Sequence, residues 1–311
     1  MSIVSATEEN IEQASQILQS GGVVSFPTET VYGLGCDTLN KEAISLVYTL
    51  KNRPNNNPLI AHVSNLSDAK KITNGWDDRC DKLASVFWPG PLTLVLNKNK
   101  CVPKEACGGG DTIAVRCPGH KTAIKLLTKF GGPISAPSAN VSGHTSPTTA
   151  IHVQMDFGNE LFILDGGVCD KGIESTVISM VGTPTILRPG SIGADAILKI
   201  ISDTKVQKSD RQNESPGSSD KHYAPKSKLV LQTKELIQNQ HGENIVFLVI
   251  NATPNIGVFV QMPSNPVEYA KYIYAKIREA DSMNPKIIYV EKPPNSPEWE
   301  AVNDRLRRAS S

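Results

Sequence analysis

Short apolar runs that each end at a proline or glycine turn recur along this chain, and they favour folds built around a sheet. Val23–Phe26 ends at Pro27, and Ile113–Arg116 leads into a Cys-Pro-Gly turn. Between such runs lie amphipathic stretches typical of helices, for example residues 7–20 and 121–130. Strands that alternate with helices predict an α/β fold, and a length of 311 residues favours two domains over one.

Polar side chains stand where these predicted strands meet their turns. They are Thr30, Arg116, Ser138, Ser175 and Arg188. Because strands of one sheet can bring such ends to a common rim, we expect these side chains to line one cavity. Its lining would be rich in cations and hydroxyls and poor in carboxylates and cysteines, which suits the binding of phosphates and of a carboxylate.

The stretch Gly131–Pro147, GGPISAPSANVSGHTSP, is a short predicted strand that opens into a loop of small polar residues. Such a loop can be ordinary polar surface. It can also bring backbone groups and hydroxyls close to a charged or heterocyclic ligand. By itself the composition of the loop is a weak signal, and it gains weight only from other segments that could meet it.

Three further polar residues admit two interpretations each. Lys51 and Arg53 follow a predicted helix over residues 41–50, where they would complement the helix dipole as solvated cations. They could instead form a phosphate clamp, with lysine as a point charge and arginine as a planar fork, but their spacing alone favours the first interpretation. His62 interrupts the apolar run Leu59–Val63, where a hydrogen-bonded core histidine is more common than a ligand.

The overall composition excludes several classes of protein. With 32 basic and 31 acidic residues, the formal net charge of +1 provides no general attraction to nucleic acid or membranes. The six cysteines form no C-x-x-C pair and show no zinc-ligand spacing with histidine, so we expect reduced thiols, a cytoplasmic protein and no metal site. No apolar run has membrane-spanning length. A dinucleotide fingerprint, a GxxxxGK[ST] loop, a GxSxG elbow and an HExxH helix are all missing.

Several motifs in order along the chain resemble one family. They are SFPTETVYGLG, the Lys51-x-Arg53 pair, PLTLVL, IAVRCP, PISAPSAN, IESTVI and ILRPG. Together they are similar to the YrdC/TsaC family of threonylcarbamoyl-AMP synthases over roughly residues 5 to 205. The segment SPGSSDKHYAPK, Ser215–Lys226, resembles the linker of the long form of these enzymes, which reaches back over the active site.

The resemblance implies a fold, a reaction and a set of partners. The fold would be a YrdC-like twisted mixed sheet with flanking helices and a basic cavity (1–204), a linker or active-site flap (205–227) and a smaller Rossmann-like parallel α/β domain (228–311). The reaction would convert ATP, L-threonine and bicarbonate into threonylcarbamoyl-AMP and pyrophosphate, with Mg2+ carried by ATP. A separate tRNA threonylcarbamoyltransferase would use the product, and direct tRNA binding would be weak.

The resemblance also assigns roles to individual residues. The catalytic set around the phosphates would be Lys51, Arg53, Ser138 and Asn140; ATP binding would also use Asn57, Thr112, Ser146, Arg188 and Tyr223; threonine binding would use Thr30, His62, Arg116, Ala136 and Ser175. Arg116 is the natural partner for the carboxylate of the amino acid, because its fork can hold two oxygens at once.

The last part of the chain carries no recognisable catalytic constellation. Predicted strands over residues 229–231, 245–250 and 287–290, with helices over 266–280 and 298–308, indicate a small parallel α/β domain. We interpret Arg305, Arg307 and Arg308 as a solvated helix end, and the domain as a platform that supports the flap. Two other functions stay open, an RNA-binding module and a different carbamoyl-transfer enzyme of the same fold.

Overall fold

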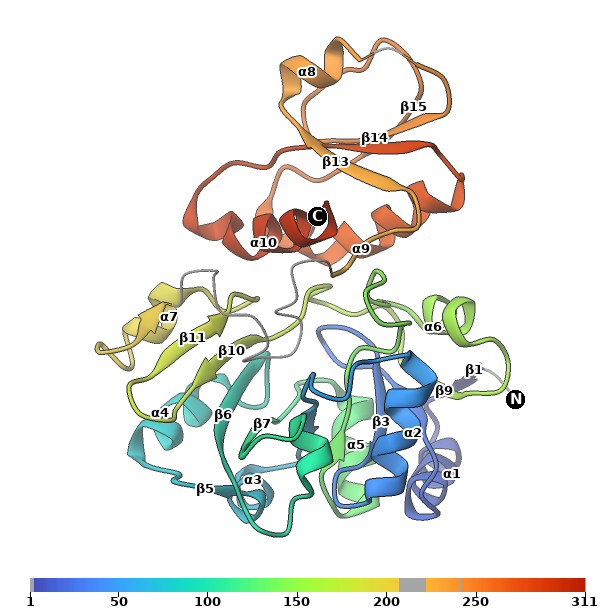
Figure 1. Cartoon of the computed structure of the whole chain (residues 1–311). Helices are drawn as coiled ribbons and strands as arrows, with labels where there is room; N and C mark the ends of the chain where they lie inside the picture. The colour runs from blue at the N-terminus through green and yellow to red at the C-terminus, as the bar shows by residue number, and fades with distance from the viewer. Residues whose placement is uncertain (1–2, 207–221, 241, 311) are drawn as a thin grey trace.

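The computed structural model describes residues 3–206, 222–240 and 242–310. The chain forms two domains, each with its own sheet, and Figure 1 shows the C-terminal domain above the larger N-terminal one. No helix of the described ranges has both the length and the apolar character needed to cross a bilayer.

The N-terminal domain contains a sheet of 12 strands. Its strands are β1 (Ile3–Ser5), β2 (Val24–Phe26), β3 (Gly33–Asp37), β4 (Ile60–His62), β5 (Thr73–Asn74), β6 (Leu92–Lys98), β7 (Thr112–Arg116), β8 (Ile134–Ser135), β9 (Phe162–Asp165), β10 (Thr176–Ser179), β11 (Thr185–Arg188) and β12 (Lys205–Val206). Its helices are α1 (Glu8–Gln19), α2 (Lys41–Lys51), α3 (Leu66–Ile72), α4 (Asp78–Phe87), α5 (Lys121–Phe130), α6 (Ala150–Phe157) and α7 (Ala194–Leu198), with a 3-10 turn at Lys104–Cys107.

The large sheet is mixed, as predicted. Its strands lie in the order β1-β9-β2-β3-β8-β4-β7-β6-β10-β11-β12, with β5 paired to β6 outside this path. Helices α1 and α5 pack together against one face through one apolar cluster, and α2 packs on the opposite face against β3. Helix α1 begins with the cap expected from the sequence, because the hydroxyl of Thr7 accepts a hydrogen bond from the backbone amide of Asn10.

Strand β3 is a feature that the sequence pattern does not predict. Gly33 and Gly35 suggest a turn, yet β3 runs antiparallel to both β2 and β8 in the middle of the sheet. A Cβ atom on Gly35 would lie 2.6 Å from Cε1 of Phe26 and 2.8 Å from Cγ2 of Ile134. The glycine is therefore required by close packing of the neighbouring side chains rather than by a turn.

The C-terminal domain is a four-stranded sheet in the order β13-β16-β14-β15, and all its pairs are parallel, as predicted. Its elements are β13 (Lys228–Gln232), α8 (Lys234–Gln238), β14 (Ile245–Val249), β15 (Val258–Gln261), α9 (Pro266–Ser282), β16 (Ile287–Glu291), a 3-10 turn at Pro297–Trp299 and α10 (Glu300–Ala309). The edge strand β15 and the short helix α8 are not among the predicted elements.

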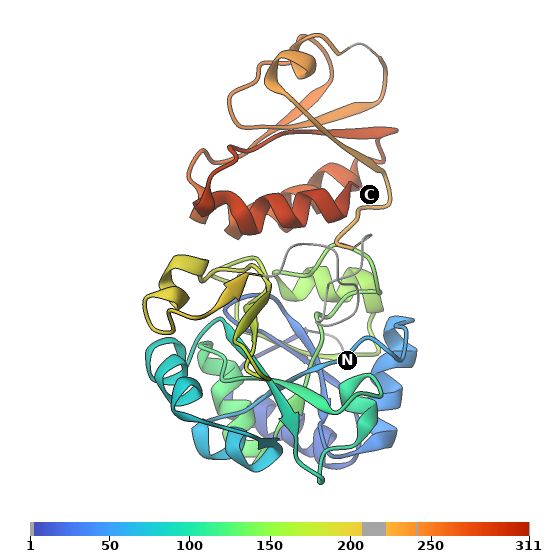
Figure 2. The same ribbon diagram turned by 60° about the vertical axis from the view of Figure 1, so that its left-hand side comes forward.

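Helices α9 and α10 lie between the sheet of the C-terminal domain and the N-terminal domain in both views of the chain (Figures 1 and 2). Val31 and Ile173 of the N-terminal domain belong to the same apolar cluster as the inner faces of these helices. An ion pair of 2.6 Å between Nη2 of Arg278 and Oδ2 of Asp156 crosses the same boundary. One apolar cluster and one ion pair thus cross the boundary between the domains.

The interpretation of the last helix as a solvated cationic end is wrong for two of its three arginines. Arg305 is fully buried, with 0% of its surface exposed, and Arg308 retains only 7%. The side chain of Arg307 is half exposed, in line with the original interpretation. A fully buried guanidinium needs charged or polar partners, so α10 must meet such groups in the domain boundary.

Replacing Gly35 by alanine tests the packing argument for β3. The added methyl group would overlap Phe26 and Ile134, so we expect the free energy of unfolding to fall by about 1–3 kcal/mol in urea denaturation. Gly193→Ala is the matched control, because φ at Gly193 is −68° and a Cβ there meets nothing within 4 Å. Equal losses in the two variants would contradict the packing argument.

Candidate active site

A cavity lies at the rim formed by the ends of β7 and β11 and the amino end of β10, where the segments that follow β2 and β8 also reach it. It is lined by residues of β4, by the first residue of β3 and the last residues of β7 and β11, by the segments that follow β2, α2 and β8, by the segment that leads into β10 and by the chain after residue 221: Thr28, Thr30, Val31, Gly33, Arg53, Ile60, His62, Arg116, Ala136, Pro137, Ser138, Glu174, Ser175, Arg188, His222 and Tyr223. The amino end of β10 reaches this rim because β10 runs parallel to β6, which is antiparallel to β7. The predicted strand-end residues do line one cavity. The expectation of a single rim is wrong, because β8 runs antiparallel to β4 and its carboxyl end does not lie beside those of β4 and β7.

Arg116 forms one side of the cavity and is almost completely buried. Its Nη1 donates to Oγ1 of Thr30 at 2.9 Å, and its Nε donates to the carbonyl of Gly90 at 3.2 Å. Its Nη2 lies 2.7 Å from Oε1 of Glu29, which forms a buried ion pair. These contacts orient the guanidinium, and the carboxylate of Glu29 balances its charge.

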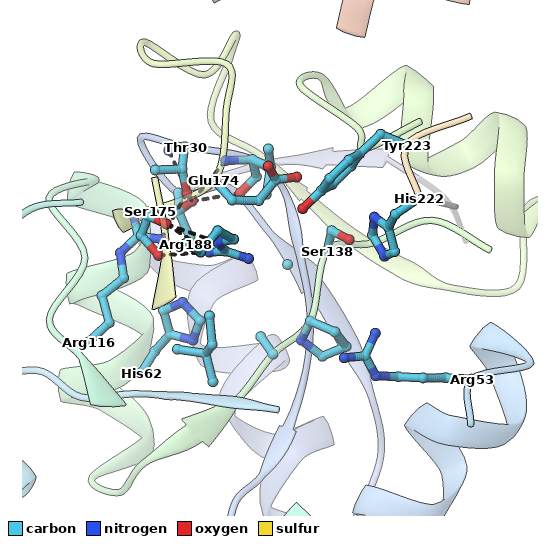
Figure 3. A pocket seen from close by; sticks show the side chains of 16 residues that line it. Thr30, Arg53, His62, Arg116, Ser138, Glu174, Ser175, Arg188, His222 and Tyr223 are labelled. Carbon is cyan, nitrogen blue, oxygen red and sulfur yellow. Dashed lines mark hydrogen bonds between the residues drawn. The ribbon is translucent and has the colours of Figure 1, made fainter. Parts of the chain in front are cut away.

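His62 lies beside Arg116 on the same side of the cavity (Figure 3). Its imidazole packs edge-on against the ring of Phe26, with 6.0 Å between ring centroids, and its Nδ1 has no hydrogen-bond partner in the described structure. Burial, helped by the nearby charge of Arg116, lowers the pKa of His62 to about 3. The ring is therefore neutral near pH 7 and keeps one nitrogen for a ligand.

Arg53 enters the cavity from the side opposite Arg116 and His62 (Figure 3). Its Nη2 donates to Oδ1 of Asn57 at 2.5 Å and to the carbonyl of Pro58 at 2.9 Å. Burial lowers the pKa of Arg53 to about 10, which still leaves the guanidinium charged at neutral pH. Asn57 thus supports Arg53 and does not itself line the cavity.

Arg188 completes the cationic lining from the end of β11. Its Nη2 donates to the carbonyl of Ser175 at 2.8 Å and approaches Oγ of Ser175 at 3.2 Å. The hydroxyl of Ser175 is also 2.7 Å from that of Thr93 in β6. Burial lowers the pKa of Arg188, as it does for Arg53. Three strands therefore fix this guanidinium and its serine partner.

Lys51 and Asn140 shape the loop around Ser138 and do not line the cavity. The ammonium group of Lys51 donates to the carbonyls of Ser138, at 2.6 Å, and of Asn140. The side-chain amide of Asn140 donates to the carbonyls of Val141 and His144, at 2.9 and 2.8 Å. Both residues hold the loop in the conformation that presents Ser138.

Two other expected nucleotide-side residues lie outside the lining. Thr112 stands at the start of β7, at the opposite end of the strand from Arg116. Ser146 lies behind the cavity wall, where its hydroxyl donates to Oε1 of Glu174 at 2.7 Å. Of the threonine-side set, Thr30, His62, Arg116, Ala136 and Ser175 all line the cavity together.

The chain after the linker closes the cavity. Residues 215–221 of the expected flap lie outside the described residues, but His222 and Tyr223 line the cavity. Tyr223 is 1% exposed, its hydroxyl has no partner among the described residues and points into the cavity (Figure 3). Its φ is +64°, a left-handed value that is costly for a bulky residue and needs support from its surroundings.

Three polar lining residues are absent from the residues assigned by resemblance. Glu174, Thr28 and His222 all face the cavity, and Glu174 is the one carboxylate among the lining residues. Each lies inside a motif that drew attention for another residue: Thr28 is near Thr30, Glu174 precedes Ser175, and His222 precedes Tyr223. Adjacency to a candidate was the signal available, but neighbours along a strand normally face opposite sides.

Family comparisons agree with this arrangement. The Sua5/YciO/YrdC family model, described as "Telomere recombination", matches residues 16–190, and the Sua5 C-terminal model, described as "Threonylcarbamoyl-AMP synthase, C-terminal domain", matches residues 192–311. The chain belongs to the Sua5/YrdC family. It has the two-domain form of that family, since the two models together span both domains.

Individual Sua5/YrdC relatives are similar over the whole chain. A threonylcarbamoyl-AMP synthase of Pyrococcus abyssi is 35% identical, with 100% of this chain and 98% of the relative covered. One of Bacillus subtilis is also 35% identical, with 99% and 94% covered. The crystal structure of P. abyssi Sua5 complexed with L-threonine superimposes with a TM-score of 0.92 at 34% identity, covering 99% of this chain and 96% of that one.

The donor chemistry of the cavity does not form a protein cage for a metal ion. Within residues 3–206, 222–240 and 242–310, no group of three His, Cys, Asp or Glu side chains is placed to hold one. Both carboxylate oxygens of Glu174 already accept hydrogen bonds from protein groups. The cavity of this Sua5/YrdC member therefore provides cations and hydroxyls for an anionic ligand.

The low pKa of His62 predicts a dependence of stability on pH. Between about pH 6.5 and pH 3 the unfolded chain binds a proton at this histidine and the folded chain does not, so the free energy of unfolding falls as the pH falls. His62→Phe should remove about 1.4 kcal/mol per pH unit of this slope between pH 6 and pH 4.5. Urea denaturation of both proteins across that range measures it; parallel curves would contradict a neutral, buried His62.

Proposed function

We propose that the chain is a threonylcarbamoyl-AMP synthase, which converts ATP, L-threonine and bicarbonate into threonylcarbamoyl-AMP and pyrophosphate. The observation that carries the proposal is the cavity itself. It sets Arg116 and His62 on one side and Arg53 on the other, with Ser138, Ser175 and Arg188 lining the same space. Such a lining can contact the carboxylate of an amino acid and the phosphates of a nucleotide. The names of the full-length relatives support the same activity.

The reaction needs no nucleophile from the protein. The free amine of threonine attacks the carbon of bicarbonate, forms a C–N bond and releases water, which leaves a carbamate. A carbamate oxygen then attacks the α-phosphorus of ATP, and the bond between this phosphorus and the leaving pyrophosphate breaks. The protein contributes by holding the reactants in line and by balancing the charge on the phosphates.

At the threonine end, Arg116 would bind the carboxylate, because a guanidinium can contact two carboxylate oxygens at once. Glu29 and Thr30 orient that guanidinium through contacts of 2.7 and 2.9 Å. The unpartnered Nδ1 of the neutral His62 imidazole would form a hydrogen bond with the hydroxyl of threonine. It can act as donor or acceptor, depending on which ring nitrogen carries the proton. Ala136 and Ser175 would bound the same subsite.

At the nucleotide end, Arg53 and Arg188 would neutralise phosphate oxygens, and Ser138 would donate its hydroxyl. Lys51 and Asn140 would act by fixing the loop that carries Ser138, which follows from their bonds to its backbone. Asn57 and Ser146 would act through Arg53 and Glu174, and Tyr223 would cover the bound nucleotide. Thr112 stays a prediction from resemblance, since it stands at the far end of β7.

The remaining partners follow from the chemistry of the product. Mg2+ would enter as part of the MgATP substrate, held by phosphate oxygens and water. The mixed anhydride is an activated acyl donor, so we propose that a tRNA threonylcarbamoyltransferase in the cytoplasm consumes it. A role as an RNA-binding module is less well supported, because the cationic groups of the cavity are buried rather than spread over a surface.

The first test measures pyrophosphate release from MgATP and bicarbonate, with and without L-threonine. We expect release that depends on threonine in the wild type, and a loss of roughly 100-fold or more in Arg53→Ala, because a buried cation at the phosphates would be gone. Lys129→Ala is the control, since Lys129 forms an exposed ion pair with Glu12 and neither residue lines the cavity. A folded wild-type protein that leaves ATP unchanged with threonine present would contradict the proposal.

A second substitution separates the two ends of the cavity. Arg116→Lys keeps the positive charge but loses the planar fork, so KM for threonine should rise roughly 10- to 100-fold. KM for ATP should change much less, because Arg116 lies across the cavity from Arg53. Initial rates at varied threonine and fixed ATP, and the reverse, measure both constants. A rise confined to KM for ATP would show that Arg116 serves the nucleotide instead.

A further inference from the structure

Arg305 of α10 is completely buried in the boundary between the domains and contacts the wall of the cavity at three points. Its Nε donates to Oε2 of Glu174 at 2.9 Å, and its Nη2 donates to the carbonyl of Pro189 at 3.0 Å. Its guanidinium lies over the ring of Tyr223, 5.3 Å from the centroid. Glu174 and Tyr223 line the cavity, and Pro189 follows directly after Arg188.

Tyr274 of α9 reinforces two of these contacts from the same domain. Its hydroxyl donates to Oε2 of Glu174 at 2.9 Å, which is the oxygen that Arg305 also contacts. Its ring stacks on that of Tyr223, with 5.5 Å between centroids and 26° between planes. The backbone amide of His222 also donates to the carbonyl of Arg308 at 3.2 Å. The strained backbone of Tyr223 is thus supported by two helices of the C-terminal domain.

We propose that Arg305 is a positioning residue for nucleotide binding, which neutralises Glu174 and so keeps Arg188 directed at Ser175 and the cavity. The inference rests on the proposed function, because it assigns the nucleotide to the side of the cavity where Arg188 lies. It gives the C-terminal domain a part in the active site that goes beyond supporting the flap.

The argument depends on the charge of Glu174. Burial alone would raise the pKa of this carboxyl group, but the charges of Arg305 and Arg188 outweigh burial and lower it, so the group is ionised. The carboxylate contacts Arg305 of the C-terminal domain and is also under the charge of Arg188 of the N-terminal domain. A buried carboxylate that loses one cationic partner turns to the other. Glu174 without Arg305 would compete with phosphate oxygens for the guanidinium of Arg188.

The key experiment combines Arg305→Met with Glu174→Gln. Arg305→Met should raise KM for ATP, and the Kd of α,β-methylene-ATP in calorimetry, by roughly tenfold or more, because Glu174 then draws Arg188 away. KM for threonine should change less than about threefold, since Arg116 is unaffected. Adding Glu174→Gln removes the charge that needs a partner, and it should restore nucleotide binding to within about threefold of the Glu174→Gln single variant.

Two further variants provide a control and a second measurement. Arg307→Met is the matched control on the same helix, because the side chain of Arg307 is half exposed and pairs with Asp304; it should behave like the wild type. Tyr274→Phe removes one donor to Glu174 and keeps the ring that stacks on Tyr223. It should weaken nucleotide binding in the same direction and to a smaller degree, and it provides the measurement if Arg305→Met does not fold.

The outcomes distinguish this inference from the proposed function. Unchanged nucleotide affinity in folded Arg305→Met, or a loss that Glu174→Gln does not relieve, would overturn the role of Arg305 and leave the synthase proposal intact. A wild type that binds the ATP analogue but releases no pyrophosphate with threonine would overturn the synthase proposal, while rescue in the binding assay would still support Arg305. A wild type that binds no nucleotide would overturn both.

Discussion

The structure depends on burying several guanidinium groups around one cavity. Arg53, Arg116 and Arg188 are each less than 9% exposed, and a buried cation is tolerated only if carbonyls, hydroxyls or an anion contact it. Here the segments between helices and strands provide those contacts. Arg53 contacts Asn57 and Pro58, Arg116 contacts Glu29, Thr30 and Gly90, and Arg188 contacts Ser175. Because these buried cations need partners, the cavity is suited to bind anionic substrates.

The packing of the sheet helps to hold these residues around the cavity. Strand β3 occupies the centre next to β2 and β8, and its glycines let the side chains of Phe26 and Ile134 approach within the same layer. A Cβ atom on Gly35 would meet the side chains of Phe26 and Ile134, so it would disturb the packed layer on this face of the sheet. This close packing explains why glycine appears where a strand former is usual.

The C-terminal domain also supplies partners for a buried charge of the N-terminal domain. Glu174 belongs to the N-terminal domain, yet Arg305 and Tyr274, from α10 and α9, contact its carboxylate. A buried ion pair of this kind contributes little net stability but strongly favours one arrangement of its partners. The C-terminal domain thus supports the cavity wall through contacts with Glu174 and Tyr223 and does not itself line the cavity.

The sequence alone determined the α/β class, the two domains and the set of strand-end residues, because hydrophobic period, turn residues and ordered motifs are local properties of the chain. It did not determine strand β3, the buried state of Arg305 or the place of Glu174 on the cavity. From the sequence, a glycine suggests a turn and an arginine at a helix end suggests exposure to solvent. The residues packed around them in the folded chain decide otherwise. Only the tertiary structure decides these cases, because close packing and charge pairing join residues more than 100 positions apart, such as Glu174 and Arg305.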